Sequence, residues 1–390
     1  MLAFDSWLFM GRELNFVGTE KAMAAKGLTQ TSVADAMGLT KAAVSKWLTG
    51  KSFPRPAELL KFGKLLGLPY ADLVRSVPDQ PAPLVAFRKR ASTKTTPDHV
   101  AHAQEMGRLL TPVVEHLGFD RFVAPGRLKD PSLDHDYLQG LVAGLRRELK
   151  LDPQGPIKFS DLIAKFSELQ AVIVPVMWGQ KQRHENALHI YLPESRTTWI
   201  YLNLDSHLHD FKFWMAHELG HVLAVDLLVA GKLEEAEDFS DAFAGALLFP
   251  EPAAREVYEN YLRARSASAR IAVIIKAAQD YVISPNSVYR EIENYAKART
   301  SLAFEELPKK SFFAVLADFN RAYASVSETL FDGKKPSADH FMRVAGDTFR
   351  TPFFAALASY LKATPQPDTL VSRILDVSLA DAKEYHQALA

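Results

Sequence analysis

The run from Trp214 to Leu223, centred on His-Glu-Leu-Gly-His, constrains this chain more than any other feature of its sequence. His217 and His221 are four residues apart, so a helix places them one turn apart on the same face. Two imidazoles in this arrangement can take two corners of a tetrahedral zinc site, with Glu218 beside them as general base. The helix also needs a buried side, and its apolar residues are Phe213, Met215, Ala216, Leu219, Val222 and Leu223.

A second predicted helix, over residues 237–244, offers carboxylates for the third corner. Glu237 and Asp241 are also four residues apart, and the apolar register of Phe243, Leu247 and Leu248 turns their face inward. Glu237 can bind the metal while Asp241 accepts the free ring N–H of a ligand histidine. The fourth corner is left for water, as in catalytic zinc sites. The alternative ligands are Glu234, Glu235 and Asp238. The alternative to a metal site is a helix whose histidines are polar surface.

Composition limits the classes of protein that the chain can belong to. Its 390 residues favour two or three domains, and the absence of cysteine leaves only histidines and carboxylates as metal ligands. The net charge is zero, so any attraction to nucleic acid must come from a local patch. No signal peptide pattern and no apolar run of about 18 residues is present, so we expect a cytoplasmic protein without a membrane segment.

The residues from Lys26 to Gly50 have the pattern of a helix-turn-helix. Thr29 and Thr40 are N-cap residues of two short helices, and Gly38 ends the first. The second helix, Thr40 to Leu48, would be the recognition helix, and 57–68 is predicted to be a further helix. Between Thr19 and Arg75 there are nine Lys or Arg and four Asp or Glu, the local positive charge expected of a DNA-binding domain.

This segment closely resembles the Cro/repressor type of helix-turn-helix, known as the XRE family. The resemblance rests on Leu-Thr-Gln at 28–30, Ala-x-x-x-Gly at 34–38 and Trp-x-x-Gly at 47–50. It implies duplex DNA as a partner. The residues carried over are Gln30 and Thr40 as phosphate contacts, with Lys41, Ala42 and Lys46 facing base edges. The alternative is a helix-turn-helix used for dimerisation or for docking a partner.

The middle of the chain predicts a small sheet that leads into the His217 helix. The expected strands are 171–176, 187–192 and 198–203, with the last two forming a hairpin. This is the order found in zinc peptidases, in which an exposed edge strand can pair with an extended substrate. Three further histidines lie near the cleft in sequence and are expected to be surface residues, namely His189, His207 and His209.

The remaining segments predict a mostly helical α+β protein. Three prolines at 78, 81 and 83 indicate an extended linker. The predicted helices outside the motifs are 99–122, 133–149, 159–169, 256–262, 271–281, 285–297, 312–330 and 341–362. The predicted domains are a helix-turn-helix bundle (1–76), a linker (77–98), a peptidase core (99–250), a helical bundle (251–300) and a helical sensing or dimerising region (301–390).

The metal motifs resemble those of the ImmA/IrrE metallopeptidases. His-Glu-Leu-Gly-His-Val-Leu is followed by Glu-x-x-x-Asp-x-Phe-Ala-x-x-Leu-Leu-Phe-Pro, where the family typically has Glu-x-x-Ala-Asn-x-Phe-Ala-x-x-Leu-Leu-Met-Pro. The resemblance implies a gluzincin-like zinc endopeptidase, with Glu237 as third ligand, that cleaves or disables helix-turn-helix repressors after DNA damage or phage-related stress. The chain departs from the pattern at Ser240, Asp241 and Phe249, which removes neither a ligand nor the base.

Two hypotheses of function follow from the sequence. The first is a stress-responsive or phage-defence regulator that joins DNA binding to zinc-dependent cleavage of a repressor, with single-stranded DNA as an activator and a homodimer as further expectations. The second is a transcription factor whose peptidase-like domain serves only as a ligand sensor or docking module. A toxin–antitoxin regulator is a third reading, which differs from these by operon context. The intact Glu218 favours the first hypothesis, because a sensor would tolerate its loss.

Overall fold

The computed structural model describes residues 12–49, 52–76, 81–86, 97–119, 128–179, 186–301 and 304–389. It separates into two compact units, Met1–Pro81 and Ala82–Ala390. Both units are rich in helices, and the second also contains a small sheet, so the predicted mostly helical α+β class is confirmed. Among the described residues, no helix is both long enough and apolar enough to cross a membrane.

The first unit is a bundle of short helices closed by a two-stranded sheet. Thr29 and Thr40 are N-caps as predicted, each accepting a backbone N–H three residues on, and Gly38 ends the first helix in the left-handed region at φ 70°. Trp47 packs on Phe62 with ring centroids 5.9 Å apart. The elements are β1 (Arg12–Leu14), α1 (Phe16–Ala25), α2 (Gln30–Met37), α3 (Lys41–Leu48), α4 (Pro56–Leu66), α5 (Tyr70–Leu73) and β2 (Val74–Ser76).

The second unit is built on a four-stranded sheet with the order β3-β5-β6-β4. The predicted hairpin is confirmed, because β5 and β6 pair in antiparallel fashion, while β4 runs parallel to β6. The strands are β3 (Leu84–Ala86), β4 (Val172–Val176), β5 (Ala187–Leu192) and β6 (Thr197–Asn203).

The strand β3 lies inside the stretch that the sequence assigns to a linker. Residues 77–80 and 87–96 of that stretch lie outside the described residues. Leu84 pairs with Tyr191 and Ala86 with His189, so β5 has a neighbour on both sides. Along Leu84–Ala86, β5 is therefore not an exposed edge strand. The pairing joins segments about a hundred residues apart, which local sequence patterns do not reveal.

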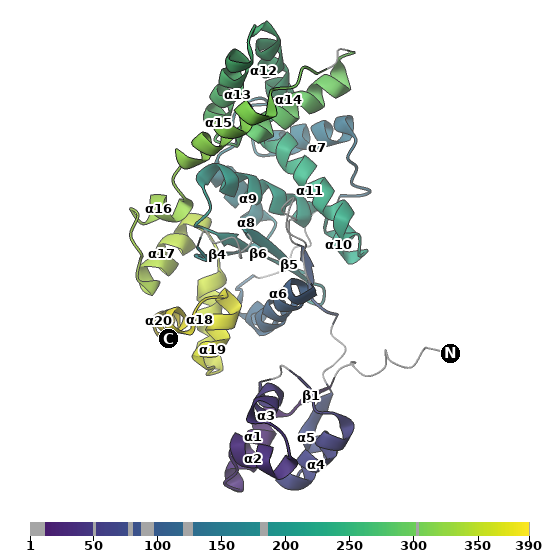
Figure 1. Cartoon of the computed structure of the whole chain (residues 1–390), viewed down its shortest axis with the longest axis vertical. Helices are drawn as coiled ribbons and strands as arrows, with labels where there is room; N and C mark the ends of the chain where they lie inside the picture. The colour runs from purple at the N-terminus through teal and green to yellow at the C-terminus, as the bar shows by residue number, and fades with distance from the viewer. Residues whose placement is uncertain are drawn as a thin grey trace, which may run out of the picture. The chain divides into compact units, whose positions relative to one another are not determined.

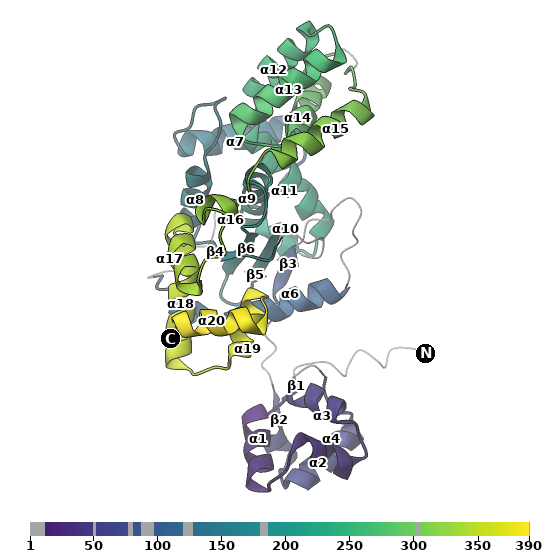
Figure 2. The ribbon, with the colours of Figure 1, turned by 60° about the vertical axis from the view of Figure 1, so that its left-hand side comes forward.

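Helices cover both faces of the sheet (Figures 1 and 2). One face carries α8 (Phe159–Glu168) and α9 (Leu208–Leu223). The opposite face carries α6 (Pro97–Leu110) and helices from the C-terminal region, where Trp199 of β6 meets Phe353 at 6.4 Å between ring centroids. Every residue of β4, β5 and β6 is buried as a result. A sheet buried on both faces consists of nearly continuous apolar strands, as observed here.

Three of the predicted helices are interrupted, each for a local reason. The helix predicted over 99–122 ends at Leu110 and continues as a 3-10 helix, η1 (Thr111–His116), because Pro112 lacks an amide hydrogen. Its last three predicted residues, 120–122, lie outside the described residues. Ser325 starts a new helix within 312–330 through a capping box with Glu328. Arg350, at φ 48°, ends the first half of 341–362.

The remaining helices complete the second unit. A bundle of three, α12 to α14, packs on α11, and the C-terminal helices α17 to α20 belong to the same apolar core as the sheet. The C-terminal region therefore helps to enclose the sheet. These helices are α7 (His135–Glu148), α10 (Val225–Val229), α11 (Leu233–Leu248), α12 (Glu251–Arg263), α13 (Ala267–Tyr281), α14 (Pro285–Arg299), α15 (Lys309–Arg321), α16 (Val326–Leu330), α17 (Ala338–Phe349), α18 (Phe353–Ala363), α19 (Asp368–Leu375) and α20 (Leu379–Leu389).

Candidate metal centre

The helix α9 places its polar residues in the interior of the second unit. It packs against the sheet, α8 and α11, so it is buried nearly all round. The side chains of His217, Glu218 and His221 are consequently buried, with 0, 3 and 1% of their surface exposed. Burying three ionisable groups in one helix costs free energy unless they are paired or bind a metal.

A close contact between α9 and α11 brings the third residue of the cluster into place. A Cβ atom added to Gly220 would lie only 2.8 Å from the Ser240 Cα, so the two helix backbones approach each other where both residues are small. Glu237 lies one turn before Ser240 on α11. The glycine of the motif and the serine of α11 thus allow the approach that carries the Glu237 carboxylate to the two histidines.

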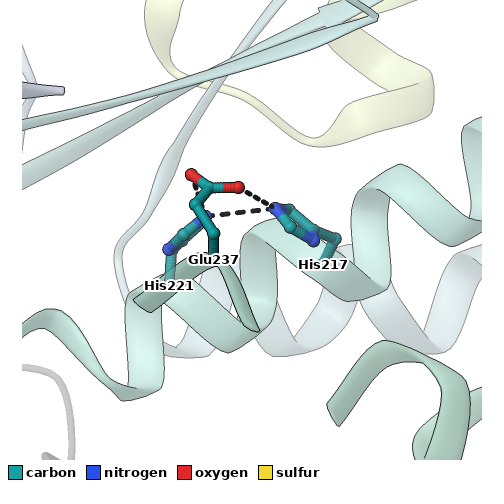
Figure 3. A group of neighbouring side chains, drawn as sticks. All are labelled: His217, His221 and Glu237. Atoms are coloured by element: carbon teal, nitrogen blue, oxygen red, sulfur yellow. Dashed lines mark hydrogen bonds and ion pairs between the residues drawn. The ribbon is translucent and has the colours of Figure 1, made fainter. Parts of the chain in front are cut away.

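The His217, His221 and Glu237 side chains converge on one point (Figure 3). One ligand atom from each lies within 4.8 Å of the other two. The Nε2 atoms of the two histidines are 3.1 Å apart, and the Glu237 oxygens lie 3.5 Å from His217 Nε2 and 3.4 Å from His221 Nε2. Among the described residues, Glu234, Glu235 and Asp238 do not join this group; all three are exposed.

The donor set fits a divalent metal ion. Both Glu237 oxygens are buried without a hydrogen-bond partner among the described residues, and so is Glu218 Oε2. His217 donates Nδ1–H to Asp241 Oδ1 at 2.9 Å, which leaves Nε2 as the ring nitrogen that faces the cluster. Two imidazole nitrogens and a carboxylate are ligands that zinc prefers.

The first unit presents a second candidate site on α3. Lys41, Ala42 and Lys46 are exposed on this helix, while Val44 and Trp47 hold its other face in the core. Thr40 caps the helix and Gln30 begins α2. The structure therefore keeps the predicted base-facing side chains free of the core, as contact with a DNA groove requires.

Comparison with known proteins assigns both units. A family model described as Helix-turn-helix matches residues 20–73, and one described as IrrE N-terminal-like domain, of the peptidase M78 type, matches residues 173–293. The chain fuses an XRE-type helix-turn-helix to an IrrE-like peptidase domain. The IrrE match includes the metal cluster and extends beyond Pro250 into α14. A search of curated proteins finds no match.

The electrostatics of the IrrE-like domain follow from burial and from the contacts among its charged groups. Burial raises the pKa of Glu218 to about 7. Burial lowers the pKa of His217, but its hydrogen bond to Asp241 and the nearby carboxylates of Glu237 and Glu218 outweigh this and raise the value to about 9. The pKa of Glu237 would be raised by burial, yet its contacts with the two histidines lower it to about 2. Glu237 is thus ionised, and Glu218 exchanges its proton near neutral pH.

The prediction that His189, His207 and His209 are surface residues is wrong. His189 and His209 are fully buried, and His207 is half-buried with Nδ1 2.8 Å from the Tyr323 carbonyl. His189 lies on β5 of the IrrE-like domain, with Nδ1 3.3 Å from Glu218 Oε2. His189 lies within an otherwise apolar run, Ala187 to Leu192, and such a run is typical of a strand buried on both faces. This pattern could have predicted that His189 is buried.

Proposed function

We propose that this chain is a DNA-binding regulator whose IrrE-like domain is a zinc-dependent endopeptidase. Its substrate would be a helix-turn-helix repressor, whose cleavage derepresses a DNA-damage or phage-defence operon. The observation that carries the proposal is the convergence of His217, His221 and Glu237 beside Glu218. Three protein ligands leave a position for water, as catalytic zinc sites require.

The roles of the residues follow from their geometry. His217, His221 and Glu237 would hold the ion, and Asp241 would orient His217 through its hydrogen bond at 2.9 Å. Zinc bound there would supply Lewis acidity, which activates water and stabilises negative charge on the peptide carbonyl oxygen. Glu218 would take the proton of the attacking water and pass it to the leaving amine. Its pKa, raised by burial to about 7, suits both proton transfers.

The helix-turn-helix domain would bring this activity to an operator. Lys41, Ala42 and Lys46 would meet base edges in the major groove of duplex DNA, and Gln30 and Thr40 would contact phosphates. We include a homodimer, single-stranded DNA as an activator, and a sensing or dimerising role for residues 301–390 in the proposal. The support for DNA binding is the family match together with the exposed residues of α3.

One observation favours the second hypothesis, a peptidase-like domain that only senses a ligand or docks a partner. The β3 strand covers β5 from His189 to Tyr191, where an extended substrate could otherwise pair. A regulator that never binds a substrate strand can keep this edge closed. Loss of Glu218 as a proton acceptor distinguishes the two hypotheses, because only the peptidase needs it.

The test is cleavage of a repressor by zinc-loaded full-length protein. A purified helix-turn-helix repressor is incubated with wild type, with Glu218→Gln and with Glu235→Gln, a matched change at an exposed carboxylate of α11. Single-stranded DNA and extract of damaged cells are included as activators. We expect cleavage by wild type and Glu235→Gln, and a rate lower by about 10²–10⁴-fold for Glu218→Gln. Equal rates for wild type and Glu218→Gln, or a stress response in cells that Glu218→Gln restores fully, would leave the sensor hypothesis standing.

A further inference from the structure

The imidazole of His189 points at the candidate metal centre from the sheet. His189 pairs with Ala86 of β3 and with Ile200 of β6, so its backbone is fixed on both sides. Its ring centroid lies 5.3 Å from that of His221, and its Nδ1 lies 3.3 Å from Glu218 Oε2. The side chain therefore approaches α9, the helix that carries the His-Glu-x-x-His (HExxH) motif, from the sheet on the opposite side of the site.

Both partners in this approach have unmet hydrogen-bonding capacity. The two ring nitrogens of His189 and the Oε2 atom of Glu218 are buried. None of these three atoms has a hydrogen-bond partner among the described residues. Leaving a buried donor or acceptor unsatisfied destabilises the folded protein. A hydrogen bond from Nδ1–H to Oε2 satisfies one atom of each residue. At 3.3 Å the two atoms are within reach but are not aligned for a hydrogen bond, and hydrogen bonds in active sites without substrate are often long or poorly aligned and tighten in the complex.

A ligand role for His189 does not fit the geometry. Its nitrogens are not part of the group of atoms that lie within 4.8 Å of one another in the described structure. A neutral imidazole carries a single N–H. With that N–H on Nδ1, the ring can donate to Glu218 and leave Nε2 as an acceptor.

We propose that His189 is a positioning residue, which donates from Nδ1 to Glu218 Oε2 and holds the other carboxylate oxygen toward the metal centre. This inference rests on the proposed peptidase function and adds to it a residue from outside the HExxH helix. His189 acts through Glu218, so its removal should disorder the base while the three metal ligands stay in place.

Three substitutions separate this role from that of a core residue. Asn can place its amide nitrogen close to the position of Nδ1, whereas Gln places it close to that of Nε2, and Ala offers no donor. We expect His189→Asn to keep most of the activity on the repressor, and His189→Gln and His189→Ala to lose about 10–100-fold in kcat at unchanged KM, less than the full general-base effect. Zinc content should equal that of wild type in all three.

A binding measurement provides a readout that does not depend on turnover. Acetohydroxamic acid chelates zinc and shares its proton with a neighbouring carboxylate, so its affinity for the zinc-loaded full chain reports on Glu218. By calorimetry, His189→Ala and Glu218→Gln should each weaken binding by about tenfold, with His189→Asn close to wild type. The double variant should be no weaker than Glu218→Gln alone, because the two residues act as one unit.

The outcomes separate this inference from the proposed function. If wild type binds zinc and cleaves while Asn, Gln and Ala variants at 189 behave alike, His189 is only a core residue and the inference is wrong. Additive losses in the double variant would also contradict it. If wild type binds zinc and hydroxamate in the predicted His189-dependent manner but cleaves nothing, the peptidase hypothesis fails and the positioning role stands.

Discussion

Gly220→Ala would test the close packing of α9 on α11, on which the cluster depends. The added Cβ would lie 2.8 Å from the Ser240 Cα and 3.0 Å from its Cβ and Oγ. Because the nearest atom belongs to the backbone of α11, a change of side-chain rotamer cannot relieve the contact, and the helices must move apart. Overpacking costs about 1–3 kcal/mol, while Gly to Ala in a helix interior ordinarily gains about 1 kcal/mol. We therefore expect the free energy of unfolding to fall by up to about 2 kcal/mol.

The matched control is Gly144→Ala on α7, where an added Cβ would meet no atom within 4 Å. This variant should gain about 0.5–1 kcal/mol from helix propensity alone. Urea unfolding of both variants measures the difference directly. Zinc affinity should also fall in Gly220→Ala, by about 10–100-fold, since Glu237 moves with α11. If Gly220→Ala were as stable as Gly144→Ala and bound zinc as tightly as wild type, the close approach would not be what places Glu237.

Three further predictions concern separate parts of the chain. Asp241→Asn should lower zinc affinity by about 10–100-fold with the fold retained, since it weakens the bond to His217; competition with a chromophoric chelator measures this. Lys46→Ala should weaken binding of operator DNA more than of random duplex; equal weakening across sequences would make Lys46 only a phosphate contact. Burial raises the pKa of Glu291 from 4.5 to about 8, so native protein holds this proton more tightly than unfolded protein, and stability should fall as pH rises through that window. Glu291→Gln should flatten this part of the pH profile, and an unchanged slope would refute the assignment.

Much of the candidate site could be predicted because its geometry is local. His217 and His221, like Glu237 and Asp241, are related by one helical turn, and helical spacing alone sets each pair on one face. The caps at Thr29 and Thr40 are local in the same sense. Sequence patterns of this kind describe single helices. They also gave the right class, a mostly helical α+β protein.

The features that sequence patterns missed depend on contacts between distant segments. The three residues of β3 follow the proline-rich stretch, and only their pairing with β5 makes them a strand. The burial of His189 likewise depends on α9, which covers its face of the sheet, and on the strands β3 and β6 beside it. The α9–α11 contact at Gly220 could be recognised only once both helices were placed.

We propose that His217, His221 and Glu237 together hold one zinc ion. Metal analysis of purified full-length protein, after zinc is supplied and excess is removed, tests it most directly. We predict about one zinc per chain for wild type and for Glu218→Gln, and almost none for His221→Ala or Glu237→Ala. Wild-type protein that stays empty, or a zinc content unchanged by loss of either ligand, would contradict the claim.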